Sequence, residues 1–179
     1  KLYADGQRQR DCGEAGVIAS IRSTTTADAA RCAEIYRPYV TDSWVSFELD
    51  PPDTAEMAHR ITAYGESHGW LVAEIEGQIA GYAYGSPHRT REAYATSSDV
   101  AVYIDATYAR RGIGKALYVA LFPMLKQRNL HALFAGIALP NEASIGLHEA
   151  MGFTAVGVYR EVGWKMGGWR DVGWWQRLL

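Results

Sequence analysis

The chain has 179 residues with a hydrophobic content of 48%, which is enough apolar material for one substantial core. A formal net charge of -2 argues against a protein that follows nucleic acid by bulk electrostatics, because such proteins carry a strongly basic face. No apolar run approaches the roughly 18 to 20 residues that span a bilayer, and residues 1–16 lack the apolar centre of a signal peptide. We therefore expect a polar arm over 1–16 and a single domain over 17–179, with neither nucleic acid nor a membrane as partner.

The cysteines bear on the compartment and on metal binding. Cys12 and Cys32 have neither the number nor the spacing of a disulfide framework or a zinc site. We predict a reducing, cytoplasmic location and no structural metal.

The first half of the domain alternates helical and extended patterns. Residues 17–23 mix β-branched and polar side chains and predict a strand that ends at a run of threonines. Residues 27–37 have apolar positions at near-helical spacing and predict a helix that stops at Pro38. Asp53 with Glu56 has the form of a capping box, which predicts a helix of about 15 residues ending near His68.

The second half begins with a hairpin pattern. Residues 70–87 divide at Glu76 and Gly77 into two β-type halves, and a further strand is predicted over 100–104. A helix is predicted after Gly112 and Gly114, and it contains Pro123. We expect a kink or a break there, because a proline inside a helix destabilises it by roughly 3 kcal/mol. A strand over 132–138, a short helix over 142–151 and two closing strands complete the order. This order predicts an α/β (α+β) fold with a mixed sheet flanked by helices.

The segment ARRGIGKAL, which follows the strand predicted over 100–104, indicates an anion-binding site. It opens a helix, whose first backbone N–H groups lack partners, and Gly112 and Gly114 allow a phosphate to approach the chain. The alternative is an ordinary structural turn.

Two other phosphate motifs are excluded by sequence. A P-loop would need Gly at 109 and Ser or Thr at 116, where this chain has Ala109 and Ala116. A dinucleotide fingerprint would need Gly where Leu117 stands.

A second group of polar residues lies on the predicted helix over 142–151. Asn141, Ser144 and His148 are separated by offsets that place them on one helical face, so they can meet one ligand. The alternative for His148 is a half-buried side chain that binds a backbone carbonyl.

Together these segments resemble the GNAT superfamily of acetyltransferases, whose pyrophosphate loop has the form (Q/R)xxGx(G/A) after an apolar strand. Ala109 departs from this pattern at the Gln or Arg position. The resemblance implies a GNAT fold, acetyl-CoA as co-substrate and no metal. It implies cofactor binding by the phosphate-loop residues Arg110, Arg111, Gly112, Ile113, Gly114 and Lys115, by the main chain of Val102, Tyr103 and Ile104, and by Asn141 and Ser144. His148 stands where a helix residue of the family, often Tyr, protonates the leaving thiolate.

A narrower resemblance extends from about Ile18 to Leu178. With SPHRTREAY at 86–94 and GWKMGGWRDVGWWQ at 163–176, the chain is similar to the phosphinothricin N-acetyltransferases, which also acetylate methionine sulfone and methionine sulfoximine. The resemblance implies that Asp99 replaces the family's general-base Glu. It implies substrate contacts by Phe47, Arg89, Arg91 and Tyr94, and a homodimer joined through the C-terminal region.

Each implied role has an alternative. Asp99 could cap a loop, the segment around Arg89 could be solvated, and Phe47 could be a core aromatic. For the whole protein, the alternatives are a GNAT enzyme for another amine, such as a polyamine, an aminoglycoside or a protein N-terminus, and a non-catalytic acyl-CoA sensor. A cationic acceptor would favour a carboxylate-rich loop, whereas residues 88–94 hold Arg89 and Arg91 against Glu92 alone.

Overall fold

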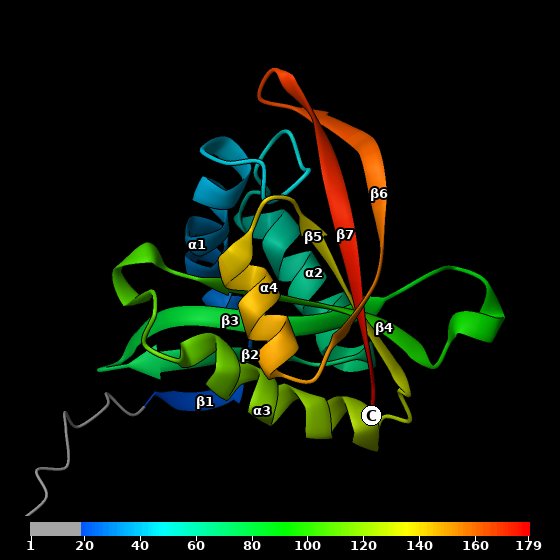
Figure 1. The fold of residues 1–179 in the computed structure, drawn as a ribbon. Helices are drawn as coiled ribbons and strands as arrows, with labels where there is room; N and C mark the ends of the chain where they lie inside the picture. Colours follow the sequence, from blue (N-terminus) through cyan, green and yellow to red (C-terminus); the bar gives the residue numbers. More distant parts are fainter. Residues whose placement is uncertain (1–18) are drawn as a thin grey trace, which may run out of the picture.

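The computed structural model describes residues 19–179, which form a seven-stranded sheet with helices on both faces (Figure 1). The strand order is β1-β2-β3-β4-β5-β7-β6, and within this sheet only β4 and β5 run parallel. The predicted mixed sheet is confirmed. The strands are β1 (Ser20–Ser23), β2 (Trp70–Ile75), β3 (Gln78–Pro87), β4 (Ser97–Ile104), β5 (Ala132–Ala138), β6 (Thr154–Lys165) and β7 (Gly168–Leu178). The predicted arm over 1–16, with Cys12, lies outside the described residues.

Helices α1 (Ala29–Thr41) and α2 (Thr54–Ser67) cover one face of the sheet, and α3 (Ile113–Gln127) and α4 (Glu142–Ala150) cover the other (Figure 1). Short 3-10 turns lie at Thr26–Asp28, Glu92–Tyr94 and Ala106–Tyr108. The Asp53 side chain caps α2 by accepting a hydrogen bond from the Glu56 backbone N–H at 2.8 Å. This cap confirms the predicted start of that helix.

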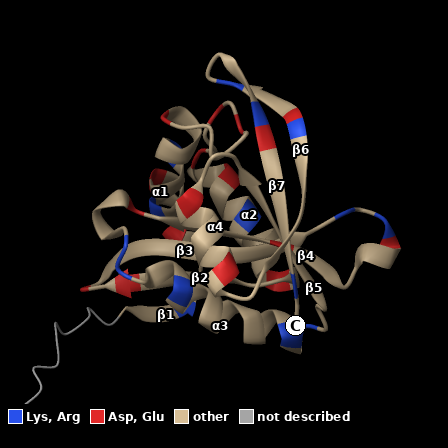
Figure 2. Ribbon diagram, viewed as in Figure 1, with Lys and Arg blue, Asp and Glu red and all other residues tan. Residues whose placement is uncertain are grey.

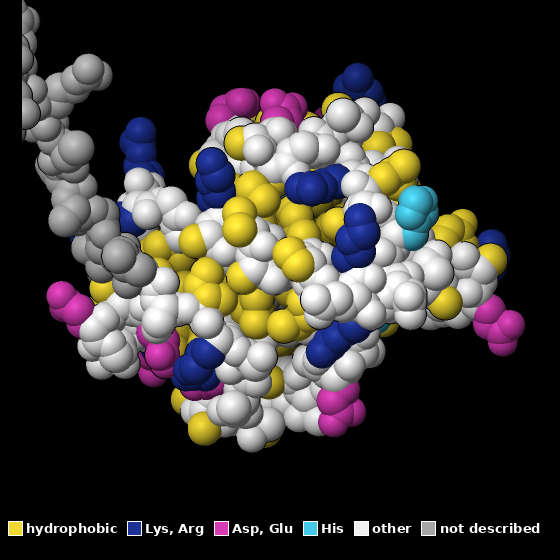
Figure 3. All heavy atoms as spheres, turned by 90° about the horizontal axis from the view of Figure 1, so that it is seen from below, with side chains coloured by type: hydrophobic (Ala, Val, Ile, Leu, Met, Phe, Trp, Pro, Cys, Tyr) yellow, Lys and Arg dark blue, Asp and Glu magenta, His cyan; other side chains and the backbone are white. Residues whose placement is uncertain are grey.

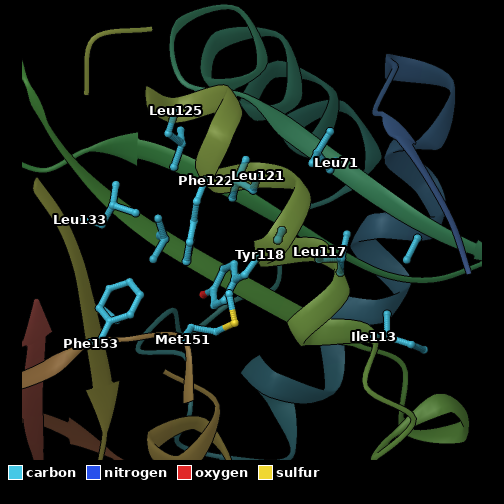
Figure 4. Packing of buried hydrophobic residues seen from close by; sticks show 14 of the residues in the cluster. Leu71, Ile113, Leu117, Tyr118, Leu121, Phe122, Leu125, Leu133, Met151 and Phe153 are labelled. Atoms are coloured by element: carbon cyan, nitrogen blue, oxygen red, sulfur yellow. The ribbon is translucent and has the colours of Figure 1, made fainter. Parts of the chain in front are cut away.

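The predicted end of the first helix at Pro38 is wrong, and the second helix does not break at Pro123. Helix α1 continues through Pro38 to Thr41, and α3 continues through Pro123. In α3, Leu121, Phe122 and Leu125 lie almost completely buried on either side of the proline (Figure 4). Burial of one such side chain contributes roughly 1.5–3 kcal/mol, so the packing of several offsets the proline cost of roughly 3 kcal/mol.

Strands β4 and β5 pair only briefly. Their register runs from Ser97 opposite Ala132 to Asp99 opposite Phe134 and then ends, although both strands continue. The backbone edge of β4 beyond Asp99 therefore has no partner strand on the β5 side. We call this gap the β4–β5 opening.

The hairpin of β6 and β7 extends well beyond the rest of the sheet (Figure 1). This hairpin leaves large apolar side chains exposed, including Val162 and Trp164 of β6 and Trp169 of β7. On another face, which includes α3, hydrophobic side chains gather in the middle with Lys and Arg around them (Figure 3). Between residues 19 and 179, no helix is both long and apolar enough to cross a membrane.

Candidate active site

The loop before α3 has the geometry of a phosphate-binding turn. Gly112 is the N-cap of α3 with a φ of +77°, and a Cβ there would meet nothing within 4 Å. At Gly114 a Cβ would lie 3.0 Å from a Leu147 methyl group, so the absence of a side chain lets α3 and α4 approach each other. The first turn of α3 leaves its backbone N–H groups without helical acceptors, and they face an open cavity.

This inner cavity has a volume of about 390 Å³. It lies between the loop, β4 and the N-terminal turn of α4, and Asn141 and Ser144 line it together with Val102. A smaller cavity shares these three residues and continues along the β4–β5 opening past Val100. The structure thus brings together the predicted residues from three separate segments: Val102 and Ile104 of β4, Arg110, Gly112, Ile113, Gly114 and Lys115 of the loop, and Asn141 and Ser144 of α4.

The backbone of β4 presents only some of its groups to the opening. The Asp105 N–H donates to the Ala80 carbonyl of β3, so alternation along an antiparallel strand turns Tyr103 toward β3 and Val102 toward the opening. The Ile104 carbonyl already accepts a hydrogen bond from the Tyr39 hydroxyl at 2.6 Å. Of the predicted main-chain contacts, Val102 has the backbone most available to a ligand.

Within the loop itself, the two arginines are arranged differently. Arg110 has a φ of +63°, and its residue borders the inner cavity. The Arg111 guanidinium lies over the Tyr108 ring at 5.4 Å from its centroid. Figure 2 shows the basic colouring of this loop where the chain enters α3.

On α4, Asn141 and His148 are held by hydrogen bonds within the fold. The Asn141 side-chain oxygen caps the helix by accepting from the Ser144 N–H at 3.1 Å, which leaves its amide NH₂ for the cavity. The Nδ1 of His148 lies 2.8 Å from the Ser144 carbonyl, which can only accept, so the proton is on Nδ1. Its Nε2 then accepts from the Tyr118 hydroxyl at 2.9 Å.

His148 is 4% exposed, and burial lowers its pKa. With both nitrogens engaged and the ring neutral, His148 has no free N–H to offer a thiolate. The arrangement favours the alternative reading of this residue, a buried histidine that binds a backbone carbonyl.

A second hollow, the outer pocket, lies on the α1–α2 side of the sheet and has a volume of about 290 Å³. Its walls come from the segment after β3, from β5 and from the β6–β7 hairpin, and they include His88, Arg89, Phe134, Tyr159 and Trp174. Gly136 of β5 makes room for the Trp174 ring, since a Cβ there would lie 3.1 Å from it.

Asp99 lies at the start of the β4–β5 opening and binds His88. Asp99 Oδ1 is 2.6 Å from His88 Nδ1. Burial raises the pKa of Asp99, while the hydrogen bond from His88 and the charge of Arg89 act in the opposite direction. The sequence pattern singled out Asp99 and missed His88. The antiparallel pairing of Ser86 with Asp99 places the end of β3 beside the start of β4, and that register is the signal that could have found it.

The predicted substrate residues of the β3–β4 segment differ in their positions. Arg89 lines the outer pocket, where its guanidinium lies 5.6 Å from the Trp174 ring centroid and donates to the His88 carbonyl at 2.8 Å. Tyr94 packs edge-on against the His88 ring at 6.0 Å. Arg91 is exposed and does not line the pocket. The segment projects from the body of the protein with basic and acidic residues near its end (Figure 2).

Phe47 lies on the loop between α1 and α2, against the β6–β7 hairpin. A Cβ on Gly163 would lie 2.3 Å from the Phe47 ring, so the ring rests directly on the glycine backbone. The loop is tied to the same hairpin by Lys165, whose ammonium donates to the carbonyls of Ser46 and Glu48, the latter at 2.8 Å. The Glu48 carboxylate in turn holds the Arg60 guanidinium of α2 at 2.7 Å. These contacts fix the position of Phe47 relative to β6.

No group of His, Cys, Asp and Glu side chains between residues 19 and 179 has the arrangement of a metal site. The free cysteine in this part of the chain, Cys32, is buried, and burial raises its pKa to about 12. Its thiol is therefore a core group.

Comparisons with known proteins agree with this geometry. Residues 21–174 match the model of the acetyltransferase (GNAT) domain. A phosphinothricin N-acetyltransferase from Streptomyces viridochromogenes is 40% identical over 157 residues, which are 88% of this chain and 86% of that protein. An L-methionine sulfoximine/L-methionine sulfone acetyltransferase from Pseudomonas aeruginosa is 32% identical over 156 residues, or 86% of this chain and 91% of that protein.

A solved structure gives the same result for the fold. A GNAT superfamily phosphinothricin acetyltransferase from Sinorhizobium meliloti, in complex with AcCoA, matches with a TM-score of 0.86 and 35% identity, covering 90% of this chain and 88% of that one. The phosphate-type turn, the β4–β5 opening and these matches lead to one conclusion: this chain belongs to the GNAT family of N-acetyltransferases.

Proposed function

We propose that this protein transfers the acetyl group of acetyl-CoA to the α-amine of a small amino acid of the phosphinothricin, methionine sulfoximine or methionine sulfone type. The observation that carries the proposal is the β4–β5 opening. It lies between the inner cavity of the phosphate-type turn and the outer pocket beside Asp99. A donor on one side and an acceptor on the other can meet there. The names of the relatives point to the same class of acceptor.

The inner cavity fits the acetyl-CoA side of the reaction. Free amides at the start of α3 suit a pyrophosphate, and Arg110 and Lys115 add positive charge at the cavity. The free backbone edge at Val102 can pair with the amide groups of a pantetheine arm. Ala109 offers no polar side chain at the first position of the loop pattern, so recognition there rests on the backbone. When bound, acetyl-CoA supplies the activated thioester.

The outer pocket fits an acidic amino acid. Arg89 supplies a guanidinium whose planar donor fork suits a carboxylate or phosphinate, while Phe134 and Trp174 supply apolar walls. Asp99 supplies a carboxylate beside this pocket, near the place where the ammonium proton must be removed. An amine must lose this proton before it can attack a thioester.

The exposed apolar side chains on β6 and β7 support a homodimer. Trp164 and Trp169 are 57% and 59% exposed, and their rings pack edge-on at 5.1 Å. Association of two copies through this hairpin would cover them, and it would act on the same hairpin that holds Phe47. Light scattering of Trp164→Glu should report a monomer if this surface joins the copies, and an unchanged mass would contradict it.

The acetyltransferase assignment is tested by following free thiol release from acetyl-CoA with several acceptors in parallel. Phosphinothricin, methionine sulfoximine and methionine sulfone should be turned over, and spermidine and an aminoglycoside should not. Turnover of only the cationic acceptors would refute the proposed substrate class. Tight acetyl-CoA binding without thiol release from any acceptor would support a non-catalytic sensor instead.

A further inference from the structure

The outer pocket contains an imidazole that none of the roles described above uses. We propose that His88 removes the proton from the acceptor amine and that Asp99 acts as its positioning residue. This inference rests on the proposed acetyltransferase function and adds a catalytic residue to it. Three features of the structure support it: the hydrogen bond between the two side chains, the fixed orientation of the ring, and its place in the pocket wall.

The hydrogen bond determines which nitrogen is available as a base. An ionised carboxylate can only accept, so the 2.6 Å contact with Asp99 Oδ1 places a proton on His88 Nδ1. In the neutral ring, Nε2 then carries the free lone pair. Among residues 19–179, Nε2 has no hydrogen-bond partner, whereas both ring nitrogens of His148 are engaged. His88 is therefore prepared to accept a proton at Nε2, and His148 is not.

The ring is held by aromatic contacts on several sides. It stacks on Phe134 of β5 with the centroids 4.1 Å apart and an interplanar angle of 12°. Tyr94 and Trp174 meet it edge-on at 6.0 and 5.9 Å. The His88 side chain is only 9% exposed, and the residue lines the outer pocket. Because the ring is held by the stack on Phe134, by two edge-on aromatic contacts and by the hydrogen bond at Nδ1, little conformational freedom is lost when it meets an acceptor.

The position of the pair also suits the reaction. Asp99 is the last residue of β4 paired with β5, and the next residue, Val100, lines the smaller cavity of the opening. His88 lines the outer pocket on the other side of the same carboxylate. The pair thus lies between the expected thioester path and the expected acceptor pocket.

The proton and bond changes balance without any further reagent. His88 Nε2 takes one proton from the ammonium, and the imidazolium is stabilised by the Asp99 carboxylate at Nδ1. The neutral amine nitrogen attacks the thioester carbonyl carbon, an N–C bond forms and the C–S bond breaks. The second amine proton passes to the thiolate to give free CoA, and His88 releases its proton to water.

Any pH profile of this step reflects several neighbouring groups. Asp99 of β4 binds the imidazole, Arg89 follows it in the chain, and Tyr94 packs against it. Tyr159 of β6 shares the pocket. Arg89 and Asp99 carry opposite charges beside the ring, so the profiles of Arg89 and Asp99 variants are recorded together with those of the His88 variants.

The test uses His88→Phe, which keeps an aromatic ring against Phe134, and His88→Ala, which leaves space for a free base. His59→Ala, an exposed histidine on α2, is the matched control. With a turned-over acceptor, both His88 variants should lose roughly 10²- to 10⁴-fold in kcat with an unchanged KM for acetyl-CoA, and His88→Phe should lose the acid limb of the pH profile. Added imidazole should restore His88→Ala but not Asp99→Asn, with rates that rise with the basicity of substituted imidazoles.

The possible outcomes separate the two proposals. An active wild type with both His88 variants within threefold of it, or a deficient His88→Ala that imidazole does not restore, would overturn the role of His88 and leave the acetyltransferase function standing. A wild type that turns over no acceptor would overturn both. Loss of activity in His59→Ala to the same degree would mean that the His88 effect is general, and would also overturn the role of His88.

Discussion

Gly112 and Gly77 form a matched pair that tests the phosphate-type turn. Both have a φ of +77°, and at both a Cβ would meet nothing within 4 Å. Substitution by Ala therefore introduces backbone strain without a clash, and left-handed backbone costs an L-residue about 1–2 kcal/mol. We predict that Gly112→Ala and Gly77→Ala each lose about 1–2 kcal/mol in the free energy of unfolding, which lowers Tm by roughly 2–8 °C for a domain of this size.

The two variants should differ in acetyl-CoA binding. Gly77 lies in the β2–β3 turn, whereas Gly112 is the N-cap of α3, and relief of strain there would rotate an amide away from the inner cavity. A hydrogen bond to a charged group contributes about 1.5–3 kcal/mol, so loss of one such bond would weaken the Kd roughly 10- to 100-fold.

Isothermal titration calorimetry with acetyl-CoA, together with thermal unfolding, measures both effects. Gly77→Ala should keep the wild-type Kd despite its lower Tm. Equal losses of affinity in both variants would mean that destabilisation alone weakens binding. A wild-type Kd in a destabilised Gly112→Ala would show that the turn does not contact the ligand.

Four further substitutions test the acceptor side. Asp99→Asn should unfold at a higher temperature than wild type at neutral pH, because burial raises the pKa of Asp99 and disfavours its ionised form. Thermal melts at several pH values should show that this gain in Tm disappears as the pH falls to 3.8, the ordinary pKa of an aspartate. Arg89→Ala should raise the KM for an acidic acceptor and leave the affinity for acetyl-CoA unchanged. Arg91 lies outside the pocket wall, so Arg91→Ala should raise this KM less. If Arg89→Ala weakened acceptor and acetyl-CoA binding equally, the loop would have a structural role. Gly163→Ala places a Cβ 2.3 Å from the Phe47 ring, so steady-state kinetics should show a changed acceptor KM, and unaltered kinetics would exclude Phe47 from the pocket.

Local chemistry explains the parts of the fold that the sequence predicts well. The Asp53 cap and the turn at Glu76 and Gly77 are formed by residues close together in the chain, so their signals are complete in the sequence. The two helix prolines behave differently. Pro38 and Pro123 disfavour a helix locally, but the burial that keeps each helix continuous comes from residues far apart in the chain. A local pattern does not contain that contribution.

The same distinction applies to the site. The glycines at 112 and 114 predict the turn, because glycine is the residue type that a positive φ or a close approach of two backbones favours. The roles of His88 and His148 depend on partners from other elements, namely Asp99 and Tyr118. The helical phase of His148 predicts a catalytic residue but does not show its bond to Tyr118, and the sequence around His88 predicts only a polar loop.

The separation of β4 from β5 has a consequence for how such a protein can change over time. The inner cavity is lined by the α3 turn, β4, α4 and Val45 of the α1–α2 loop, whereas the outer pocket is lined by the segment after β3, by β5 and by the β6–β7 hairpin. Few side chains belong to both sets. Substitutions in the outer walls therefore leave the groups around the inner cavity in place, and the proposed acceptor specificity can change while the proposed acetyl-CoA site stays intact.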